Sequence, residues 1–224
     1  MDDLLAIQAR LQAEADEVVR ALDLVAQLQE LGQPTRVGSS ALGLMVRRDI
    51  DITVSCERLD AATLGAFAQL GARLVLRTDL VVTVRFRNDS GRWNAEPQNY
   101  PDGLYLGLSV RTAAGADWTF DIWLVDQPDR QPDLVHLRTL LPRLTDADRG
   151  MILAIKHVLA AGDPAEQKIP SALVYEAVMD HGVRDVEGFG RGMRAGRGKA
   201  REVVRQRRRE TAAKPGRALA ACNP

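Results

Sequence analysis

The first thirty residues carry apolar side chains at helical spacing. These positions recur at steps of three or four residues, or their sums: Leu4, Ile7, Leu11, Val18, Leu22, Val25 and Leu28. The pattern predicts one long amphipathic helix over residues 3–31, ended by Gly32 and Pro34. This helix either packs on its own domain or, because its period is close to a heptad, forms the coiled coil of a homodimer. Alanines at several seam positions favour the first alternative.

From residue 35 the pattern changes to short apolar runs rich in β-branched residues. Strands are expected near residues 35–38, 50–55, 73–77, 80–87, 104–111 and 117–125, with a helix near 59–70. Short turns between several strands predict a sheet that is antiparallel or mixed. Residues 88–103 are polar and rich in turn formers, so they are expected to form a long hairpin loop. In this loop, Trp93 and Tyr100 either stack on a flat substrate or hold the loop against the body.

After Pro128 the pattern is helical, with helices expected over residues 132–141, 145–161 and 171–181 and a cap at Thr145. Residues 188–198 contain five glycines and three arginines and are expected to be flexible, followed by a basic helix over 199–213. The expected class is α+β: a mixed sheet with helices on one side, a long N-terminal helix and a C-terminal helical region. The expected segments are the helix 1–33, the core 34–127, the helical region 128–183 and a basic, partly disordered tail, 184–224.

Composition divides the chain into two parts of opposite charge. The chain is 46% hydrophobic, which excludes wholesale disorder, and its 30 basic residues balance its 30 acidic ones. Residues 184–224, however, carry 12 Lys and Arg against 4 Asp and Glu, so a basic tail follows an acidic body. Two distant cysteines, Cys56 and Cys222, exclude a disulfide scaffold, and no apolar run is long enough for a membrane span. We therefore expect a soluble cytoplasmic protein.

Two aspartates interrupt a short apolar strand near its start. Asp49 and Asp51 are two residues apart, so both carboxylates project from one face of the strand, about 6.6 Å apart along it, opposite Ile50 and Ile52. An acidic pair on a sheet beside a core is costly unless a cation neutralises it. Magnesium prefers such oxygen ligands, often together with phosphate oxygens.

A phosphate-binding turn and a third acid complete this pattern. Gly38 and Ser39 stand at the end of a predicted strand and before a short helix. A glycine there lets backbone N–H groups approach a phosphate, and the helix N-terminus favours the negative charge. Asp121 interrupts a later apolar strand and projects from the face opposite Phe120 and Ile122. The turn and the three acids together predict a site for metal ions and phosphate.

This arrangement resembles the active-site signature of the DNA-polymerase-β-like nucleotidyltransferase superfamily, which includes small antibiotic-modifying and minimal nucleotidyltransferases. The resemblance covers residues 34–126. It implies a nucleotidyltransferase-like fold in which the turn Gly38-Ser39 holds nucleotide phosphates. It also implies that Asp49 and Asp51 bind two Mg²⁺ ions, and that Asp121 binds a metal and helps to activate the attacking hydroxyl.

The resemblance further implies a reaction. An NMP group, AMP by expectation, would pass from an NTP, ATP by expectation, to an acceptor hydroxyl with release of pyrophosphate, using Mg²⁺ or Mn²⁺. A small acceptor such as an aminoglycoside- or lincosamide-like compound suits the acidic body. One alternative is transfer to tRNA or protein with the basic tail as RNA-binding arm; another is a non-catalytic nucleotide-binding or antitoxin-like partner.

Several further side chains have two interpretations. By the same resemblance, Lys156 is expected to reach the triphosphate; otherwise it is an exposed helix lysine. Arg47 and Arg48 either contact phosphates or form a solvated turn. Tyr175 either packs in the core or faces a cleft that holds the acceptor. His136 is expected at the surface rather than in a site.

Overall fold

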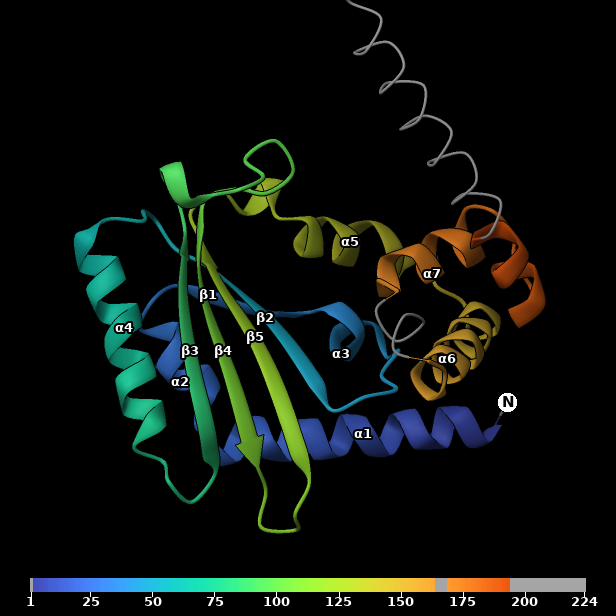
Figure 1. The fold of residues 1–224 in the computed structure, drawn as a ribbon, viewed down its shortest axis with the longest axis horizontal. Coiled ribbons are helices and arrows are strands. Elements are labelled where there is room, and N and C mark those ends of the chain that lie inside the picture. Colours follow the sequence, from blue (N-terminus) through green and yellow to red (C-terminus); the bar gives the residue numbers. More distant parts are fainter. Residues whose placement is uncertain (1, 164–168, 194–224) are drawn as a thin grey trace, which may run out of the picture.

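The computed structural model describes residues 2–163 and 169–193. It contains a mixed sheet with helices before, between and after its strands (Figure 1). The elements are α1 (Asp2–Ala21), α2 (Leu24–Gln29), β1 (Gln33–Val37), α3 (Gly38–Leu42), β2 (Asp49–Ser55), α4 (Ala61–Val75), β3 (Val81–Asp89), β4 (Gly103–Arg111), β5 (Asp117–Val125), α5 (Pro132–Leu140), α6 (Asp146–Ala161) and α7 (Ser171–Met179). Three single-turn 3₁₀ helices lie at Gly91–Trp93, Pro128–Arg130 and Leu141–Arg143.

The five strands of the sheet follow the order β1-β2-β5-β4-β3. β2 and β5 run parallel, whereas the other neighbouring pairs are antiparallel. The parallel pair joins strands that are far apart in the sequence, so it places the Asp49–Ser55 strand directly beside Asp117–Val125. This architecture confirms the predicted α+β class with a mixed sheet.

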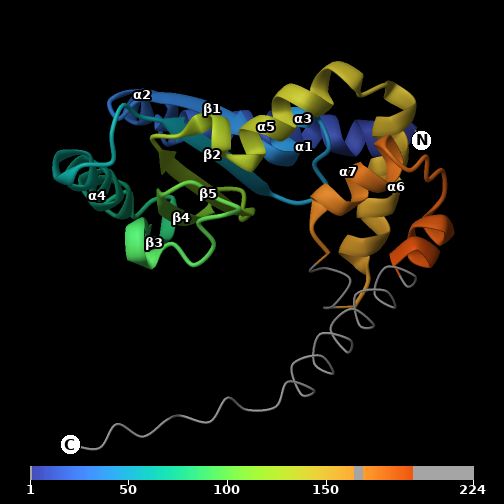
Figure 2. The same cartoon turned by 90° about the horizontal axis from the view of Figure 1, so that it is seen from above.

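One face of the sheet is apolar and is covered by helices. Helices α1, α2 and α4 pack on it, and α4 lies at the opposite end of the molecule from α6 and α7 (Figure 2). The alternating strand residues that face these helices are fully or nearly fully buried: Ile50, Ile52, Val54, Leu104, Leu106, Leu108, Phe120, Ile122 and Leu124. The other face carries the polar residues of the same strands, and it holds the candidate site.

The predicted N-terminal helix is interrupted. Helix α1 ends at Ala21, and Asp23 takes a left-handed conformation with φ of 50° before α2 begins at Leu24. One continuous helix over residues 3–31 is therefore wrong. The buried side chains of α1 and α2, which include Leu11, Val18 and Leu28, belong to the core under the sheet. This packing agrees with the interpretation of a helix that packs on its own domain.

The predicted strand near residues 73–77 does not exist, because α4 continues to Val75. The apolar run there serves a helix: Leu70 and Leu74, four residues apart, are buried against the sheet, whereas Leu76 is exposed. Asp60 starts this helix, since its side chain accepts a hydrogen bond from the Thr63 N–H.

The C-terminal helices form a second core. α5, α6 and α7 lie close to their predicted positions, and Thr145 caps α6 in a capping box with Asp148. The second core includes Leu42, Leu44, Ile152, Ile155, Val174 and Val178. Phe189 was expected in a flexible segment, but residues 186–193 are helical and the Phe189 side chain is buried in the second core. The basic helix expected over 199–213 lies outside the described residues.

Helix α1 joins the two cores. Leu4 and Leu5, near its start, pack against the helical core, whereas Leu11 and Val18, further along, belong to the core under the sheet. The two cores therefore share one rigid element. In the described ranges, 2–163 and 169–193, no helix has the length and apolar character that a membrane crossing needs.

Candidate functional site

The parallel pairing of β2 and β5 brings the three predicted acids to one face of the sheet. Asp51 is the cross-strand partner of Asp121, and Asp49 pairs with Thr119 two positions earlier. Both strands bury the intervening residues, Ile50 and Phe120, on the opposite face. Because the registers match, the carboxylates of Asp51 and Asp121 leave adjacent strands side by side.

The glycine-serine turn lies directly against this acidic pair. Gly38 begins α3 with φ of 61°, and a Cβ built on it would lie 2.1 Å from Oδ2 of Asp51. Only glycine fits there, both for its backbone conformation and for the space. Val37, the residue before the turn, is the β1 partner of Asp51 in β2. The backbone of the turn therefore lies within reach of any group that the Asp51 carboxylate binds.

The carboxylates repel one another in a partly buried setting. Burial, followed by the charges of Asp49, Asp133 and Asp121, raises the pKa of Asp51 to about 8. Burial also raises the pKa of Asp49, partly offset by a 2.5 Å hydrogen bond donated by Thr119 Oγ1. A cation bound between these side chains would stabilise their ionised form over their protonated form.

Lys156 is buried beside these acids rather than exposed on its helix. Only 7% of the residue is accessible, and its Nζ donates to the carbonyl oxygen of Leu44 at 2.7 Å and to the Tyr175 hydroxyl at 3.4 Å. Burial lowers the pKa of Lys156 to about 8, against the attraction of Asp51. Lys156, Ser39 and Asp49 line the same small hollow, of about 100 Å³.

A larger cavity, of about 250 Å³, opens between the sheet and the C-terminal helices. Its walls bring together the turn, the acid pair and the helices: Gly38, Ser39, Leu42, Asp49, Asp51, Asp133, His136, Pro170, Ser171, Ala172 and Tyr175. Tyr175 is 5% exposed, packs in the second core and also lines this cavity.

Two residues of this cavity were given no role from the sequence. Asp133, whose pKa burial raises, was not singled out, and His136, expected at the surface, is half-buried and lines the cavity. Both lie on α5, three residues apart and therefore on one helix face. This spacing could have indicated that they act together. Their position beside the acids could not be predicted, because it depends on how α5 packs in the tertiary structure.

Tyr105 is a second omission. Its hydroxyl donates a short hydrogen bond to Oδ1 of Asp121, so it fixes the orientation of that carboxylate. The phenol crosses Gly107, where a Cβ would lie 2.6 Å from the Tyr105 hydroxyl oxygen. Nothing in the spacing of the strand 103–111 indicates this contact, because it depends on the pairing of β4 with β5.

Of the other residues singled out in the sequence, Arg47 lies near the acids and the rest lie apart from them. Arg48 pairs with Glu14 of α1 at 2.9 Å, whereas Arg47 lines the hollow that contains Lys156. Trp93 and Tyr100 are exposed in the loop between β3 and β4, and Arg92 stacks on the Trp93 ring at 4.5 Å.

The donor set fits a hard divalent cation. Among residues 2–163 and 169–193, no three or more His, Cys, Asp or Glu side chains already surround one point as metal ligands. Asp51 and Asp121 nevertheless occupy paired positions on adjacent strands, Asp51 lies against the backbone of Gly38, and Asp49 lies two residues earlier on the same face of β2. Magnesium commonly takes one or two carboxylates and completes its shell with water and substrate phosphates. The pair and the adjoining turn match that requirement.

Comparisons with known proteins find similarity in structure but not in sequence family. No protein-family model matches the chain, and the search of curated proteins finds no match. A solved structure of a cytoplasmic RNA terminal U-transferase is similar over 72% of this chain, with 17% identity and a TM-score of 0.43. The match covers 47% of that transferase, so this chain spans about half its length. The similarity assigns neither an activity nor an acceptor to the chain.

Proposed function

We propose that this chain is a metal-dependent nucleotidyltransferase that moves an NMP group, AMP in the first instance, from an NTP to an acceptor hydroxyl. One observation carries the proposal: Asp51 and Asp121 are cross-strand partners on the parallel strands β2 and β5, and the backbone of Gly38 lies against Asp51. A carboxylate pair and a phosphate-binding turn are thereby combined in one place. Phosphoryl transfer needs little beyond such positioning and charge.

The residues divide between phosphate and metal binding. Gly38 and Ser39 would bind the β- and γ-phosphates through backbone N–H groups, and Asp49, Asp51 and Asp121 would hold Mg²⁺. When bound, the ions supply charge stabilisation to the attacking and leaving oxygens. Because the three carboxylates alone do not form a finished ligand cage, the site is expected to be completed by the phosphates of the NTP.

Lys156 and Arg47 supply the protein's own positive charge. Lys156 lies in the same hollow as Ser39, so a triphosphate held by the turn comes within its reach. Pyrophosphate gains negative charge as it leaves, and a buried ammonium stabilises that charge more than an exposed one does. Phosphate binding also raises the pKa of Lys156 from about 8, which keeps the side chain protonated.

Asp121 is the group placed to accept the proton of the acceptor hydroxyl. The acceptor oxygen forms a bond to the α-phosphorus, the bond from that phosphorus to the β-phosphate oxygen breaks, and pyrophosphate departs. The hydroxyl proton passes to Asp121, whose other oxygen is held by Tyr105. Tyr105 is thus a positioning residue.

The test is a measurement of metal-dependent transfer. The full chain is incubated with each of the four NTPs, Mg²⁺ or Mn²⁺ and a panel of hydroxyl acceptors, and pyrophosphate and nucleotidylated product are both quantified. Asp51→Asn and Asp121→Asn should each reduce the rate by about 10³-fold or more. A chain that releases no pyrophosphate with any acceptor, or that keeps its rate in Asp121→Asn, would refute the proposal.

Asp117→Asn is the matched control. Asp117 lies on the same strand and the same face as Asp121, but it is exposed and paired with Arg111 at 2.6 Å. The substitution removes one carboxylate from β5 at a distance from the acid pair, so the rate should stay within about twofold of the wild type.

A further inference from the structure

A row of charged residues extends from the acid pair to the far edge of the sheet. Asp51 pairs with Asp121, Asp121 with Gly107 of β4, and Gly107 with Arg85 of β3. Neighbouring strands are about 4.8 Å apart, so Arg85 starts about 10 Å from Asp121 on the same face. Gly107 contributes no side chain, which leaves the space between them to the Tyr105 phenol.

A second row, next to the first, is aromatic. Arg87, Tyr105 and Trp123 are successive cross-strand partners on β3, β4 and β5. The Tyr105 and Trp123 rings are 5.3 Å apart between centroids, and the Arg87 guanidinium lies over both, at 4.7 and 5.4 Å. The two rows form one surface, which we call the arginine-aromatic surface: Arg85, Arg87, Tyr105 and Trp123.

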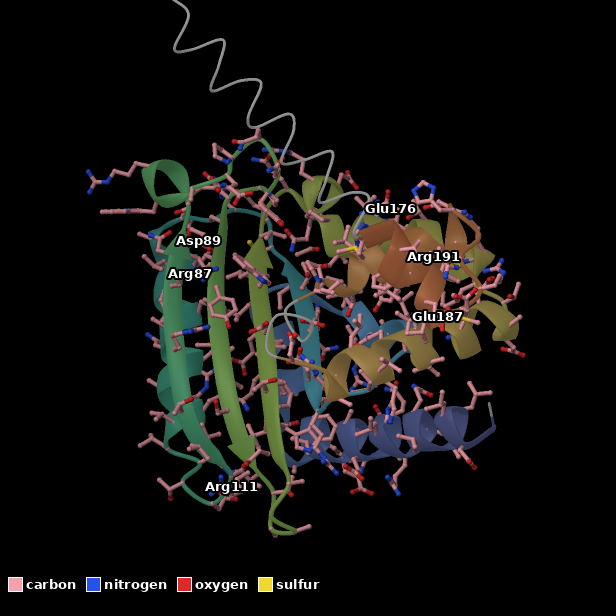
Figure 3. The ribbon with its side chains drawn as sticks, turned by 45° about the vertical axis from the view of Figure 1, so that its right-hand side comes forward. Arg87, Asp89, Arg111, Glu176, Glu187 and Arg191 are labelled. Carbon is pink, nitrogen blue, oxygen red and sulfur yellow. The ribbon has the colours of Figure 1, made fainter. Side chains whose placement is uncertain are left out.

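The two arginines of this surface are held differently. Both oxygens of Asp89 bind Nε of Arg87, at 2.9 and 2.8 Å, which fixes the plane of its guanidinium (Figure 3). Arg85 is exposed, donates to the Tyr105 hydroxyl at 3.1 Å, and forms no ion pair within the described ranges of the chain. Arg87 therefore offers a fixed flat face, and Arg85 offers N–H donors for an anion.

We infer that the arginine-aromatic surface binds the acceptor, and that the acceptor is a nucleotide unit, with a flat base and a phosphate. This inference rests on the proposed function. Nucleobases stack on aromatic rings and on guanidinium planes, and phosphates take bidentate hydrogen bonds from arginine. A base on Arg87 and Trp123 with its phosphate at Arg85 brings the ribose hydroxyls toward Asp121.

The local charge opposes a cationic acceptor. The acidic body as a whole favours cations, but beyond the Tyr105 hydroxyl the arginine-aromatic surface carries two guanidinium ions, of which Arg87 is paired with Asp89 and Arg85 has no carboxylate partner within the described residues. An aminoglycoside-like compound would bring several ammonium groups against them. Local charge within a few ångströms decides binding more strongly than the net charge of the body. The surface therefore selects a nucleotide unit, either free or at the 3′ end of an RNA.

Direct binding without a metal tests this inference separately from catalysis. The full chain in EDTA, where the carboxylates repel a triphosphate, is titrated with AMP, with UMP and with a ten-nucleotide RNA that has a free 3′ hydroxyl. Arg85→Ala and Trp123→Ala should each weaken binding about fivefold or more. Arg85→Lys, which keeps the charge but loses the planar fork, should restore part of the affinity.

Arg111→Ala is the matched control, since Arg111 is an exposed, ion-paired arginine at the opposite end of the sheet from Arg87 (Figure 3). It should leave affinity unchanged. Tighter binding of the RNA than of AMP identifies an RNA end as the acceptor, and the reverse identifies a free nucleotide. Equal affinity of Arg85→Ala and wild type, or binding of kanamycin in place of nucleotides, overturns the inference. Mg²⁺-dependent ATP binding, measured on the same preparation, reports on the proposed function alone.

Discussion

Lys156 shows how burial changes the chemistry of a single side chain. A lysine on a helix between apolar residues is ordinarily solvated, but Lys156 is buried against Leu44 and Tyr175 of the helical core, with the Leu44 carbonyl oxygen as its nearest acceptor. The ammonium ion loses hydration there, and this loss lowers its pKa to about 8 from an ordinary value of 10.5. The protein therefore holds a costly charge next to its acids, which supports the proposed role of Lys156 in binding phosphate.

This cost predicts a pH dependence of stability. Between pH 8 and 10 the unfolded chain binds a proton at Lys156 that the folded chain has lost, so the free energy of unfolding rises with pH, by up to about 1.4 kcal/mol per unit. Lys156→Met should remove this rise. Denaturant melts of both proteins in EDTA at pH 8, 9 and 10 measure the difference. A wild-type curve parallel to that of Lys156→Met would show that the lysine is not desolvated.

Tyr105 predicts a kinetic effect confined to one step. Tyr105→Phe keeps the ring under Arg87 and removes the hydroxyl, which donates to Asp121 and accepts from Arg85. Loss of one hydrogen bond to a charged group should lower kcat about tenfold, with the KM for ATP unchanged. Steady-state kinetics with varied ATP separate the two constants. A raised KM with an unaltered kcat would instead place Tyr105 in nucleotide binding.

At the scale of elements, the break between α1 and α2 follows from two leucines. Leu22 and Leu24 are both fully buried. On one straight helix two such residues point about 200° apart, so one of them would face away from the sheet. The left-handed Asp23 between them turns the chain, and both side chains reach the core. The apolar positions on either side of the break keep helical spacing, which explains why the period alone predicts one helix.

Asp23 should therefore accept glycine with a gain in stability. Asp23→Gly relieves an L-residue held at φ of 50° and should raise the free energy of unfolding by about 0.5–1 kcal/mol. Arg20→Gly, at an exposed position in the last turn of α1, should instead lower it by about 0.5 kcal/mol. Urea denaturation of the two variants checks both signs. Destabilisation by Asp23→Gly would mean that the aspartate side chain itself supports the turn.

Local sequence patterns predict most of the helices and strands, but they do not predict which side chains contact one another across strands. Alternation within each strand indicates that Asp49, Asp51 and Asp121 leave the apolar face, because that depends only on neighbours along the chain. Tyr105 and Arg85 lie near Asp121 because of the register in which β3, β4 and β5 pair. The sequence of a single strand does not determine this register. The apolar run near residue 74 fits a strand or a helix equally well until its partner is known.

At the scale of the whole molecule, the candidate site lies where the two cores meet. Asp51 comes from the sheet and Gly38 directly follows β1, whereas Lys156 and Tyr175 come from helices α6 and α7. Helix α3 leads from one to the other, since it starts at the turn and ends at Leu42 in the second core. A ligand that contacts both sets of residues must therefore hold the two cores together.

Mg²⁺ with ATP should accordingly raise the melting temperature of the whole chain in a single transition. At a ligand concentration about 100 times the Kd, the gain in stability is about 2.7 kcal/mol, or about 5–10 °C for a chain of this size. Asp51→Asn should lose the shift, because the metal ligand is gone, and Lys156→Met should lose part of it, because the triphosphate no longer contacts the helical core. Asp117→Asn should keep the full shift. Differential scanning calorimetry in Mg²⁺ alone, in ATP with EDTA and in both together measures each contribution. A full shift in Lys156→Met would mean that the nucleotide binds to the sheet alone, and the assignment of Lys156 to the triphosphate would then be wrong.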